Sequence, residues 1–237
     1  MLILLVFLVV LYRMTSVKKH TPLGNGIYTM PDLALILGLS QPKVRRWMNE
    51  YWNTEFLDKK GKKYSTGEGQ SKVTDFKTLI EFFVFYQLRE MNIGVKKIFD
   101  AHARISSQLK TQYPFASVEI LANKKDIFYS LSEEASVNAN KTQQIGFKVL
   151  IESFCKKIEF SNDKIAERFY PLGKEKSVVV DPSHQFGQPT INGTNILAET
   201  IYSMYQSGEK QEIIGILYDL TSKQIDDAIA FHKQKAA

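Results

Sequence analysis

Residues 29–51 read TMPDLALILGLSQPKVRRWMNEY, and this stretch decides the fold of the first half of the chain. Thr29 suits a helix N-cap and Asp32, three residues later, suits a capping box, so we expect a helix to begin here. Gly38 ends this helix, because glycine tolerates the left-handed conformation that follows a last turn. Ser40 then begins a second helix, and two short helices joined by a tight glycine-containing turn are typical of a helix-turn-helix.

The second helix is expected to have an apolar face and a basic face. Its apolar residues recur every three or four positions, which predicts a buried stripe. Polar residues lie outside that stripe, and in the major groove of DNA arginine recognises guanine while asparagine recognises adenine. The stripe consists of Val44, Trp47, Met48 and Tyr51, and the predicted DNA contacts are Ser40, Gln41, Lys43, Arg45, Arg46 and Asn49.

A run of turn residues and lysines, Asp58–Ser71, follows the second helix. We expect a β-hairpin whose tip carries the lysines, because lysines there can neutralise backbone phosphates beside the groove. A solvated helix face and a solvated turn are the alternative interpretation of the same residues. The predicted phosphate contacts are Lys59, Lys60, Lys62, Lys63 and Tyr64.

The chain of 237 residues has a formal net charge of +6, and its basic residues are concentrated in the first half. Residues 13–113 contain 17 Lys and Arg against 9 Asp and Glu, whereas residues 114–237 contain 14 against 16. This imbalance favours a polyanionic partner for the first half alone.

Several residue patterns argue against an enzyme, a metal site and a disulfide framework. The single cysteine cannot form an internal disulfide, which fits the cytoplasm, and four scattered histidines show no metal-ligand spacing. Asp226 and Asp227 are neighbours on an expected helix and point about 100° apart, so they form no acid/base pair. Asp181, Ser183 and His184 stand too close in sequence to align as a catalytic triad. We therefore expect no catalytic residue, no cofactor and no metal.

The first residues contain an apolar run, Leu2–Tyr12, that is too short to span a bilayer. It lacks the basic region and the small-residue cleavage site of a secretory signal. We expect the biological chain to begin at Met14, with a short membrane-associating tail as the alternative.

The chain as a whole is expected to be α+β and mainly α-helical, in four regions. These are an N-terminal tail (1–26), a winged helix-turn-helix DNA-binding unit (27–112), a mixed middle region for dimerisation or linkage (113–176) and a C-terminal unit (177–237). In the C-terminal unit a short β element precedes three helices that resemble a helix-turn-helix. The expected strands cover 117–122, 126–131 and 177–180, and the expected helices after the first two cover 74–91, 95–110, 147–157, 197–206, 210–218 and 222–235.

Residues 27–110 resemble the winged helix-turn-helix of MerR-type regulators. The resemblance rests on IYTMPDLALILGLSQPKVRRWM, on KKYS in the hairpin and on VTDFKTLIEFFVFYQLREMNIGVKKI. Residues 44–47 stand at the Leu-Arg-Tyr-Tyr stretch of that family, so the resemblance implies that Arg45 contacts DNA, while Arg46 and Trp47 replace the two tyrosines. Lys63 and Tyr64 stand at the Arg/Tyr pair of the family's wing.

Residues 177–235 resemble a small VapB-type antitoxin domain, the domain-of-unknown-function family 433. Asn195 stands where that family usually has arginine after its Gly-Thr pair. The resemblance implies a DNA-binding repressor that is paired with a PIN-like ribonuclease toxin. The matching motifs are Asp181-Pro182, Gly187-Gln-Pro189, Gly193-Thr194, Gly208-Glu209 and Leu220-Thr221.

Together these features predict a homodimeric, cytoplasmic, sequence-specific DNA-binding antitoxin that represses transcription and neutralises a toxin. Its expected partners are a double-stranded DNA operator, a PIN-like ribonuclease toxin and a second copy of itself, with no membrane. The first alternative is a stand-alone MerR-like regulator that senses a small molecule in residues 114–176. The second, an RNA-processing enzyme, lacks an assembled acid cluster in the sequence.

Overall fold

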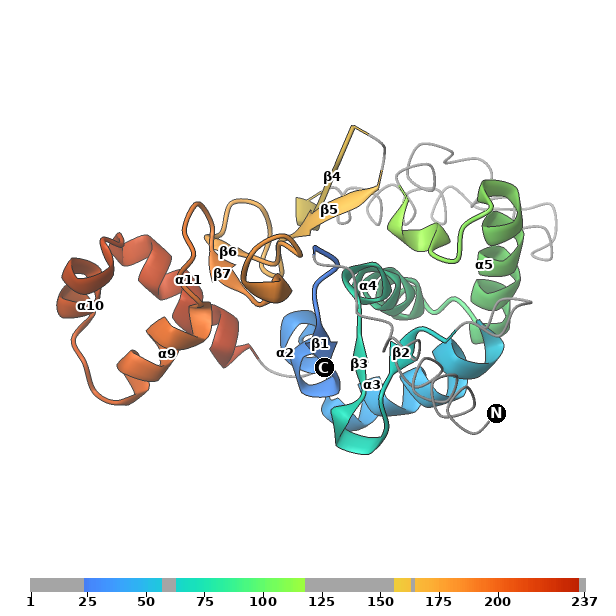
Figure 1. Ribbon diagram of the computed structural model, residues 1–237, viewed down its shortest axis with the longest axis horizontal. Coiled ribbons are helices and arrows are strands. Elements are labelled where there is room, and N and C mark those ends of the chain that lie inside the picture. Colours follow the sequence, from blue (N-terminus) through green and yellow to red (C-terminus); the bar gives the residue numbers. More distant parts are fainter. Residues whose placement is uncertain (1–23, 57–62, 118–155, 163–164, 235–237) are drawn as a thin grey trace, which may run out of the picture.

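The computed structural model describes residues 24–56, 63–117, 156–162 and 165–234, and these form a mixed α+β fold that is mainly helical (Figure 1). The predicted fold class is therefore confirmed. The elements from the first half of the chain gather at one end of the molecule, and the last three helices form the other end (Figure 1). None of the helices in the described ranges combines the length and the apolar character needed to cross a membrane.

The N-terminal part begins with a short strand, which was not predicted, and with the two helices that the capping residues predicted. Thr29 and Asp32 form the expected capping box, in which the Thr29 hydroxyl and the Asp32 carboxylate each accept the other residue's backbone N–H. Gly38 adopts the left-handed conformation, with φ of 64°, and ends the first helix. The second helix continues without a break into a π-helical segment. The elements are β1 (Tyr28–Thr29), α2 (Met30–Leu37), α3 (Gln41–Trp47) and η1 (Met48–Glu55).

The hairpin lies later in the chain than the position predicted from the run of lysines. Strand β2 (Ser65–Thr66) pairs with β3 (Val73–Thr74) through Ser65↔Thr74, so the turn between them comprises residues 67–72 and contains the 3₁₀ segment η2 (Gly69–Ser71). The expectation that the lysines form the tip is therefore wrong for Lys63, which precedes β2, and Lys59, Lys60 and Lys62 lie outside the described residues. Strand β3 also pairs with β1, giving an antiparallel sheet of order β1-β3-β2.

Helix α4 (Phe76–Glu90) forms the core of the N-terminal part, followed by α5 (Val95–Leu109) and the 3₁₀ segment η3 (Pro114–Ala116). Both helices match their predicted ranges to within two residues. The Trp52 ring stacks on Phe82 with ring centroids 3.9 Å apart, and Trp47 meets Phe85 edge-on at 5.0 Å. These contacts fix α3 and η1 against α4.

A buried polar pair joins α4, α5 and η3. Glu81 is fully buried and its Oε2 atom lies 3.0 Å from Nε2 of His102, which is 3% exposed. The other carboxylate oxygen accepts the backbone N–H of Phe115 at 2.7 Å. Burial raises the pKa of Glu81, against the opposing effect of these contacts. All three elements are therefore held by a single carboxyl group.

The C-terminal part consists of short strands followed by three helices, whose predicted ranges are confirmed. The isolated Phe169↔Val180 bridge links the first strand pair to the second. Strands β4 (Ile158–Phe160), β5 (Ala166–Phe169) and β7 (Thr190–Ile191) were not predicted. The strands predicted at 117–122 and 126–131 and the helix predicted at 147–157 lie almost wholly outside the described residues. The remaining elements are β6 (Val178–Val179), η4 (Gln185–Gly187), α9 (Ala198–Gln206), α10 (Gln211–Tyr218) and α11 (Ser222–Lys233).

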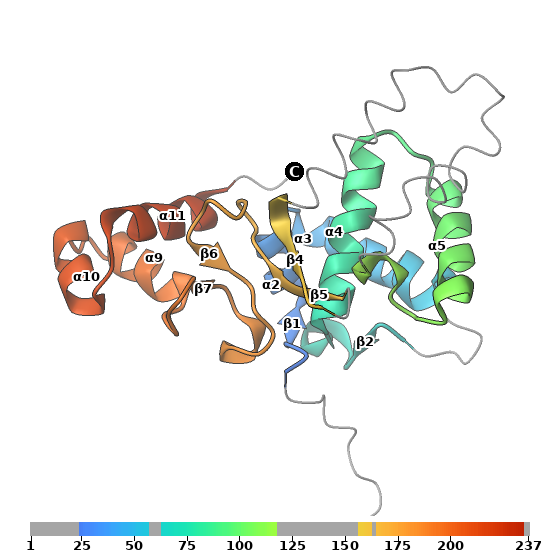
Figure 2. The same cartoon turned by 90° about the horizontal axis from the view of Figure 1, so that it is seen from above.

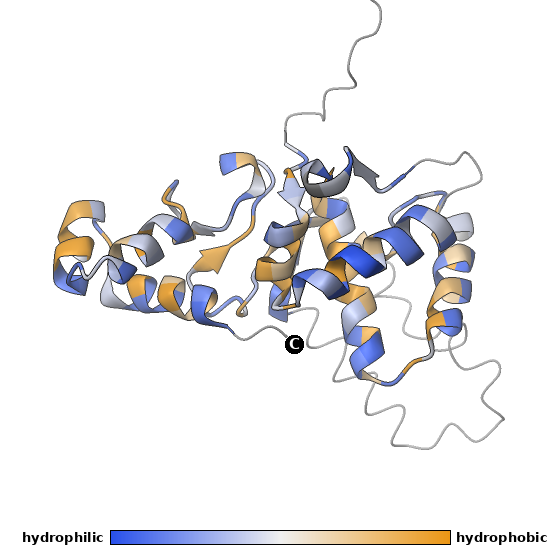
Figure 3. Ribbon diagram, turned by 90° about the horizontal axis from the view of Figure 1, so that it is seen from below, coloured by the Kyte–Doolittle hydropathy of each residue, from blue (hydrophilic) through white to orange (hydrophobic). Residues whose placement is uncertain are grey.

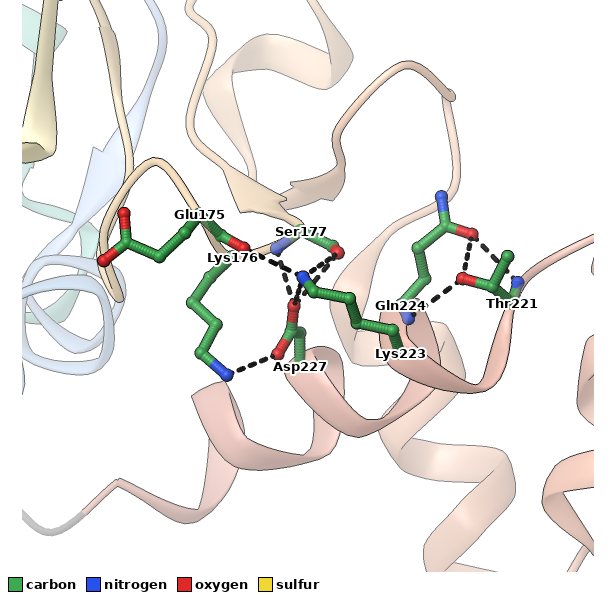
Figure 4. Close-up of polar contacts among 7 residues, drawn as sticks. All are labelled: Glu175, Lys176, Ser177, Thr221, Lys223, Gln224 and Asp227. Carbon is green, nitrogen blue, oxygen red and sulfur yellow. Dashed lines mark hydrogen bonds and ion pairs between the residues drawn. The ribbon is translucent and has the colours of Figure 1, made fainter.

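Asp227 ties α11 to the chain that enters β6 (Figure 4). Its carboxylate, 3% exposed, accepts hydrogen bonds from Lys176 and Lys223 at 2.9 Å each and from the backbone N–H and hydroxyl of Ser177. Burial by itself raises the pKa of Asp227, but the hydrogen bonds from Lys223, Lys176 and Ser177 outweigh it and lower the pKa to about 2. Asp227 is therefore a structural anion, and its neighbour Asp226 is exposed.

The two ends of the molecule meet where η4 packs against β1 (Figure 2). Ile27 donates its N–H to the carbonyl of Phe186 at 2.8 Å, and a Cβ atom placed on Gly187 would lie 2.2 Å from the Tyr28 hydroxyl. Gly187 also has φ of +84°, so both the conformation and the close approach require glycine there. On the other side of the junction the rings of Phe83 and Phe169 lie 4.9 Å apart.

Replacement of Glu81 by alanine should lower the free energy of unfolding by roughly 3 kcal/mol, because it leaves the buried His102 ring and the Phe115 N–H without their acceptor. Chemical denaturation monitored by fluorescence measures the change. Glu90→Ala, at an exposed position of the same helix, is the control and should change it by less than about 0.5 kcal/mol. Equal stability of the two variants would contradict the anchoring role of Glu81.

Asp227→Asn should lower the free energy of unfolding by about 2 kcal/mol at neutral pH. The folded-state pKa of Asp227 lies below the ordinary value of 3.8, so its contribution is present above that value and is lost as pH falls through about 2. Denaturation curves at a series of pH values should show parent and variant converging in acid. Asp226→Asn is the matched control, and a similar loss in that variant would exclude a specific effect.

Candidate nucleic-acid interface

Helix α3 presents its basic face to solvent because its apolar face is held in the core. Val44 is fully buried and Trp47 is 6% exposed, and the Trp47 ring packs against Phe82 and Phe85 of α4. The residues Gln41, Arg45 and Asn49, four positions apart, are all exposed and form one row along the helix. From below, α3 and η1 form a predominantly hydrophilic ridge on the molecule (Figure 3). A row of this kind on a protruding helix can meet base edges in a major groove.

Two further cations of α3 flank this row. Arg46 is exposed and lies 4.0 Å from Glu50, an ion pair between two half-exposed side chains that contributes little stability. Lys43 lies over the rings of Trp47 and Tyr86, with its Nζ 5.9 and 5.8 Å from their centroids. The aromatic contacts hold the Lys43 stem against α4, so its ammonium group stays at the edge of the basic face.

The hairpin is attached to the same face of the helix. Lys72 donates from Nζ to Oδ1 of Asn49 at 2.5 Å, and Asn53 donates from Nδ2 to the Ser65 hydroxyl at 2.9 Å. Lys72 therefore brings a cation next to the row of Gln41, Arg45 and Asn49, and sequence analysis did not identify it. The glycines at 67 and 69 are the sequence feature that could have located the turn, and with it Lys72.

The prediction that Tyr64 contacts a DNA phosphate is wrong. Tyr64 is only 3% exposed, and its hydroxyl donates to the carbonyl oxygen of Gln112 at 2.6 Å. Its backbone carbonyl in turn accepts from the Thr74 hydroxyl. The side chain is thus part of the core between the hairpin and the chain beyond α5, where a backbone phosphate cannot reach it.

Of the remaining predicted DNA contacts, two lie in the described part of the chain near α3 and the hairpin. Lys63 is exposed and lies two residues before Ser65, the residue that contacts Asn53 of η1. Ser40 occupies the N-cap of α3, but its side chain makes no capping hydrogen bond. The other three lysines predicted to bind phosphate, Lys59, Lys60 and Lys62, lie outside the described residues.

A second polar cluster lies in the C-terminal part, around Asp181. Its carboxylate accepts from Nε of Arg168 at 2.9 Å and from the backbone N–H of Ser183 at 2.8 Å, and lies 3.1 Å from Nδ1 of His184. Burial by itself raises the pKa of Asp181, but these partners outweigh it and lower the pKa. Ser183 contacts Asp181 through its backbone N–H, whereas His184 meets Asp181 through its ring.

This cluster borders a cavity of about 370 Å³ between β5, β6 and the turn after β7. Arg168 and Asp181 neutralise each other there, and nothing in the described part of the chain groups three or more metal-ligating side chains. The hydrogen bonds and ion pairs of Asp181 hold the start of the turn at residues 181–187 in place.

Comparisons with known proteins relate the C-terminal part to a family and the whole chain to proteins of Mycobacterium tuberculosis. Residues 178–232 match the family described as "Protein of unknown function (DUF433)", which confirms the predicted resemblance of this region. The uncharacterized protein Rv2308 is 22% identical over 225 residues, covering 90% of this chain and 92% of that protein. A protein described as "Putative antitoxin VapB45" is 26% identical over 90 residues, 38% of each chain.

The crystal structure of Rv2018 from Mycobacterium tuberculosis has a similar fold. The two structures align with a TM-score of 0.66, over 85% of this chain and 96% of Rv2018, at 15% sequence identity. At this identity the likeness shows a shared fold. It extends well beyond the DUF433 region, so the N-terminal part and the C-terminal part occur together in another solved protein.

Tyr64→Phe should lower the free energy of unfolding by about 1 kcal/mol, because the Gln112 carbonyl loses its hydroxyl donor. Nucleic-acid affinity should stay at the parent value, since the phenol is buried in the core. Denaturation and fluorescence-anisotropy titration with duplex DNA measure the two effects separately. If the variant has parental stability but binds DNA more weakly, Tyr64 contacts DNA and its assignment to the core is wrong.

Proposed function

We propose that this protein is a DNA-binding antitoxin that represses transcription through its N-terminal part, acting as a homodimer. In this proposal α2 and α3 are a helix-turn-helix of the MerR type, α3 is the recognition helix and the β2–β3 hairpin is the wing. The observation that carries the proposal is the exposed row of Gln41, Arg45 and Asn49, flanked by Arg46 and joined to the hairpin through Lys72.

The energetics of such an interface divide between two kinds of contact. Arg45, in the middle of the exposed row, is placed to hydrogen-bond base edges, which gives sequence preference. Lys63 and Lys72, at the hairpin, are placed to neutralise phosphates, which gives affinity that is independent of sequence and falls with salt. Two copies that present their α3 helices to half-sites one helical turn apart would recognise a palindromic operator.

The partner we propose is a PIN-like ribonuclease toxin. Support comes from the similarity over 90 residues to the protein described as "Putative antitoxin VapB45" and from the DUF433 match in the C-terminal part. We propose a role in binding rather than catalysis, in which Asp227, paired with Lys176 and Lys223, and Asp181, paired with Arg168 and His184, serve the fold. The toxin proposal is tested by co-expression with the product of the adjacent gene. A complex that suppresses the metal-dependent RNA cleavage of that product supports it, and two proteins that elute separately contradict it.

Arg45→Ala should weaken binding to the duplex upstream of the protein's own gene on the order of 10- to 100-fold, and should change binding to an unrelated duplex much less. The reason is that a base contact is lost, so the preference between the two sequences shrinks. Fluorescence-anisotropy titrations at fixed salt measure both affinities.

Lys63→Ala should instead weaken binding to both duplexes equally and reduce the slope of log affinity against log salt by about 1. Lys174→Ala, at an exposed position of the C-terminal part, is the matched charge control and should leave both titrations unchanged. Parental binding by the Arg45 and Lys63 variants alike would refute the proposed interface.

A further inference from the structure

Helix α10 carries an apolar stripe on its exposed face. Ile216 is 78% exposed, Leu217 62% and Ile213 41%, and these residues stand at helical spacing on one side of the helix. The opposite side is anchored, since Ile214 is fully buried. These three are half of the six large apolar side chains that the described residues expose. An apolar stripe concentrated on one eight-residue helix marks an interaction surface more strongly than scattered exposed residues do.

The stripe lies at the outer end of the molecule, away from α3. Figure 1 places α10 at the tip of the C-terminal part, and Figure 3 shows it as a strongly hydrophobic helix there. The helix is held from inside by α9 and α11, with which it shares a core through Ile214, Leu220 and Ile225. A partner that covered the stripe would therefore leave the basic face of α3 accessible.

One edge of the stripe is acidic. Glu212 stands four residues before Ile216 on α10 and is exposed beside the stripe, and the C-cap residue Asp219, also exposed, adds a second carboxylate at the end of the helix. Glu209, which is also exposed, precedes the N-cap Lys210 and adds a further negative charge before the start of the helix. Lys210 is the exposed cation on the other side. A partner that matches this surface therefore has an apolar groove with basic residues along one rim.

A second copy of the chain fits this surface poorly. The three side chains offer roughly 300 Å² of apolar area per copy, well below the roughly 800 Å² per partner of a stable interface. An antiparallel two-fold pair of α10 helices would also bring both acidic edges to the same side, where they repel. The charges and the area therefore favour a different protein whose groove extends beyond α10.

We propose that α10 is the element that docks into the partner protein, with Ile213, Ile216 and Leu217 as anchors in an apolar groove and Glu212 and Asp219 against its basic rim. The inference rests on the proposed function, because the occupant is then the toxin. Amphipathic helices commonly bind in this way, through anchors at positions i, i+3 and i+4. Docking at this end leaves α3 free, so one chain binds operator and partner together.

The test uses the full-length chain co-expressed with the product of the adjacent gene. The double variant Ile216→Ser, Leu217→Ser should weaken the complex at least about 30-fold, because two anchors are lost. Its melting temperature and its affinity for DNA should match the parent, since both side chains are exposed. The control Ile165→Ser removes an exposed isoleucine elsewhere and should leave the complex at parental affinity.

A second variant tests the acidic edge without altering the apolar stripe. Glu212→Gln combined with Asp219→Asn should slow association and flatten its dependence on salt, as measured by surface plasmon resonance at several ionic strengths. Asparagine keeps the left-handed backbone of residue 219, where φ is 52°, so the fold is retained. Unchanged association in this variant would remove the charge argument and overturn the assigned rim.

The remaining outcomes separate this inference from the proposed function. If the parent binds the gene product and the double serine variant binds it equally well, the docking role of α10 is wrong and the antitoxin proposal stands. If the parent itself does not bind, the antitoxin proposal fails and this inference fails with it. If the double variant changes a dimer into a monomer in sedimentation, the stripe is a contact between copies and the inference is overturned.

Discussion

The packing of two tryptophans against α4 determines which way the basic helix faces. Trp52 stacks flat on Phe82 and Trp47 meets Phe85 edge-on, so α3 and its π-helical continuation cannot rotate about their axis without losing these contacts. Burying side chains of this size contributes several kcal/mol through apolar area alone. With that side of the helix fixed inward, the row of Gln41, Arg45 and Asn49 has to face solvent. The candidate interface is thus a consequence of the aromatic core.

The sequence predicted correctly those elements whose formation depends on residues close together in the chain. The Thr29 capping box, the left-handed Gly38 and the three C-terminal helices depend on contacts within a few residues, and all were predicted. Strands of two to four residues are too short to show a period, so β4, β5 and β7 were not predicted. The contact between Lys72 and Asn49 joins residues 23 apart in the chain, and it follows only from the pairing of β2 with β3. Tyr64 was wrongly predicted to contact DNA because its hydroxyl bonds to Gln112, a residue far from it in the chain.

The two ends of the molecule differ in net charge. Residues 13–113 carry an excess of eight positive charges, which attracts a polyanion, while residues 114–237 carry a small negative excess. The basic face on α3 and the acidic edge on α10 have the same signs of charge as the parts of the chain to which they belong. In the proposed function, the end that meets nucleic acid and the end that meets a protein therefore do not compete for one surface.

The contact between Gly187 and Tyr28 limits how far the two ends can be treated as separate modules. The Tyr28 hydroxyl is buried without a hydrogen-bond partner in the described part of the chain, and burial together with the nearby Asp181 raises its pKa well above 10. Any side chain at position 187 would collide with that ring. A fragment that ended before β4 would uncover Tyr28 and Phe83 and gain an adhesive apolar surface. Chimaeras that exchange one end for that of a relative would have to carry the tyrosine and the glycine across as a pair.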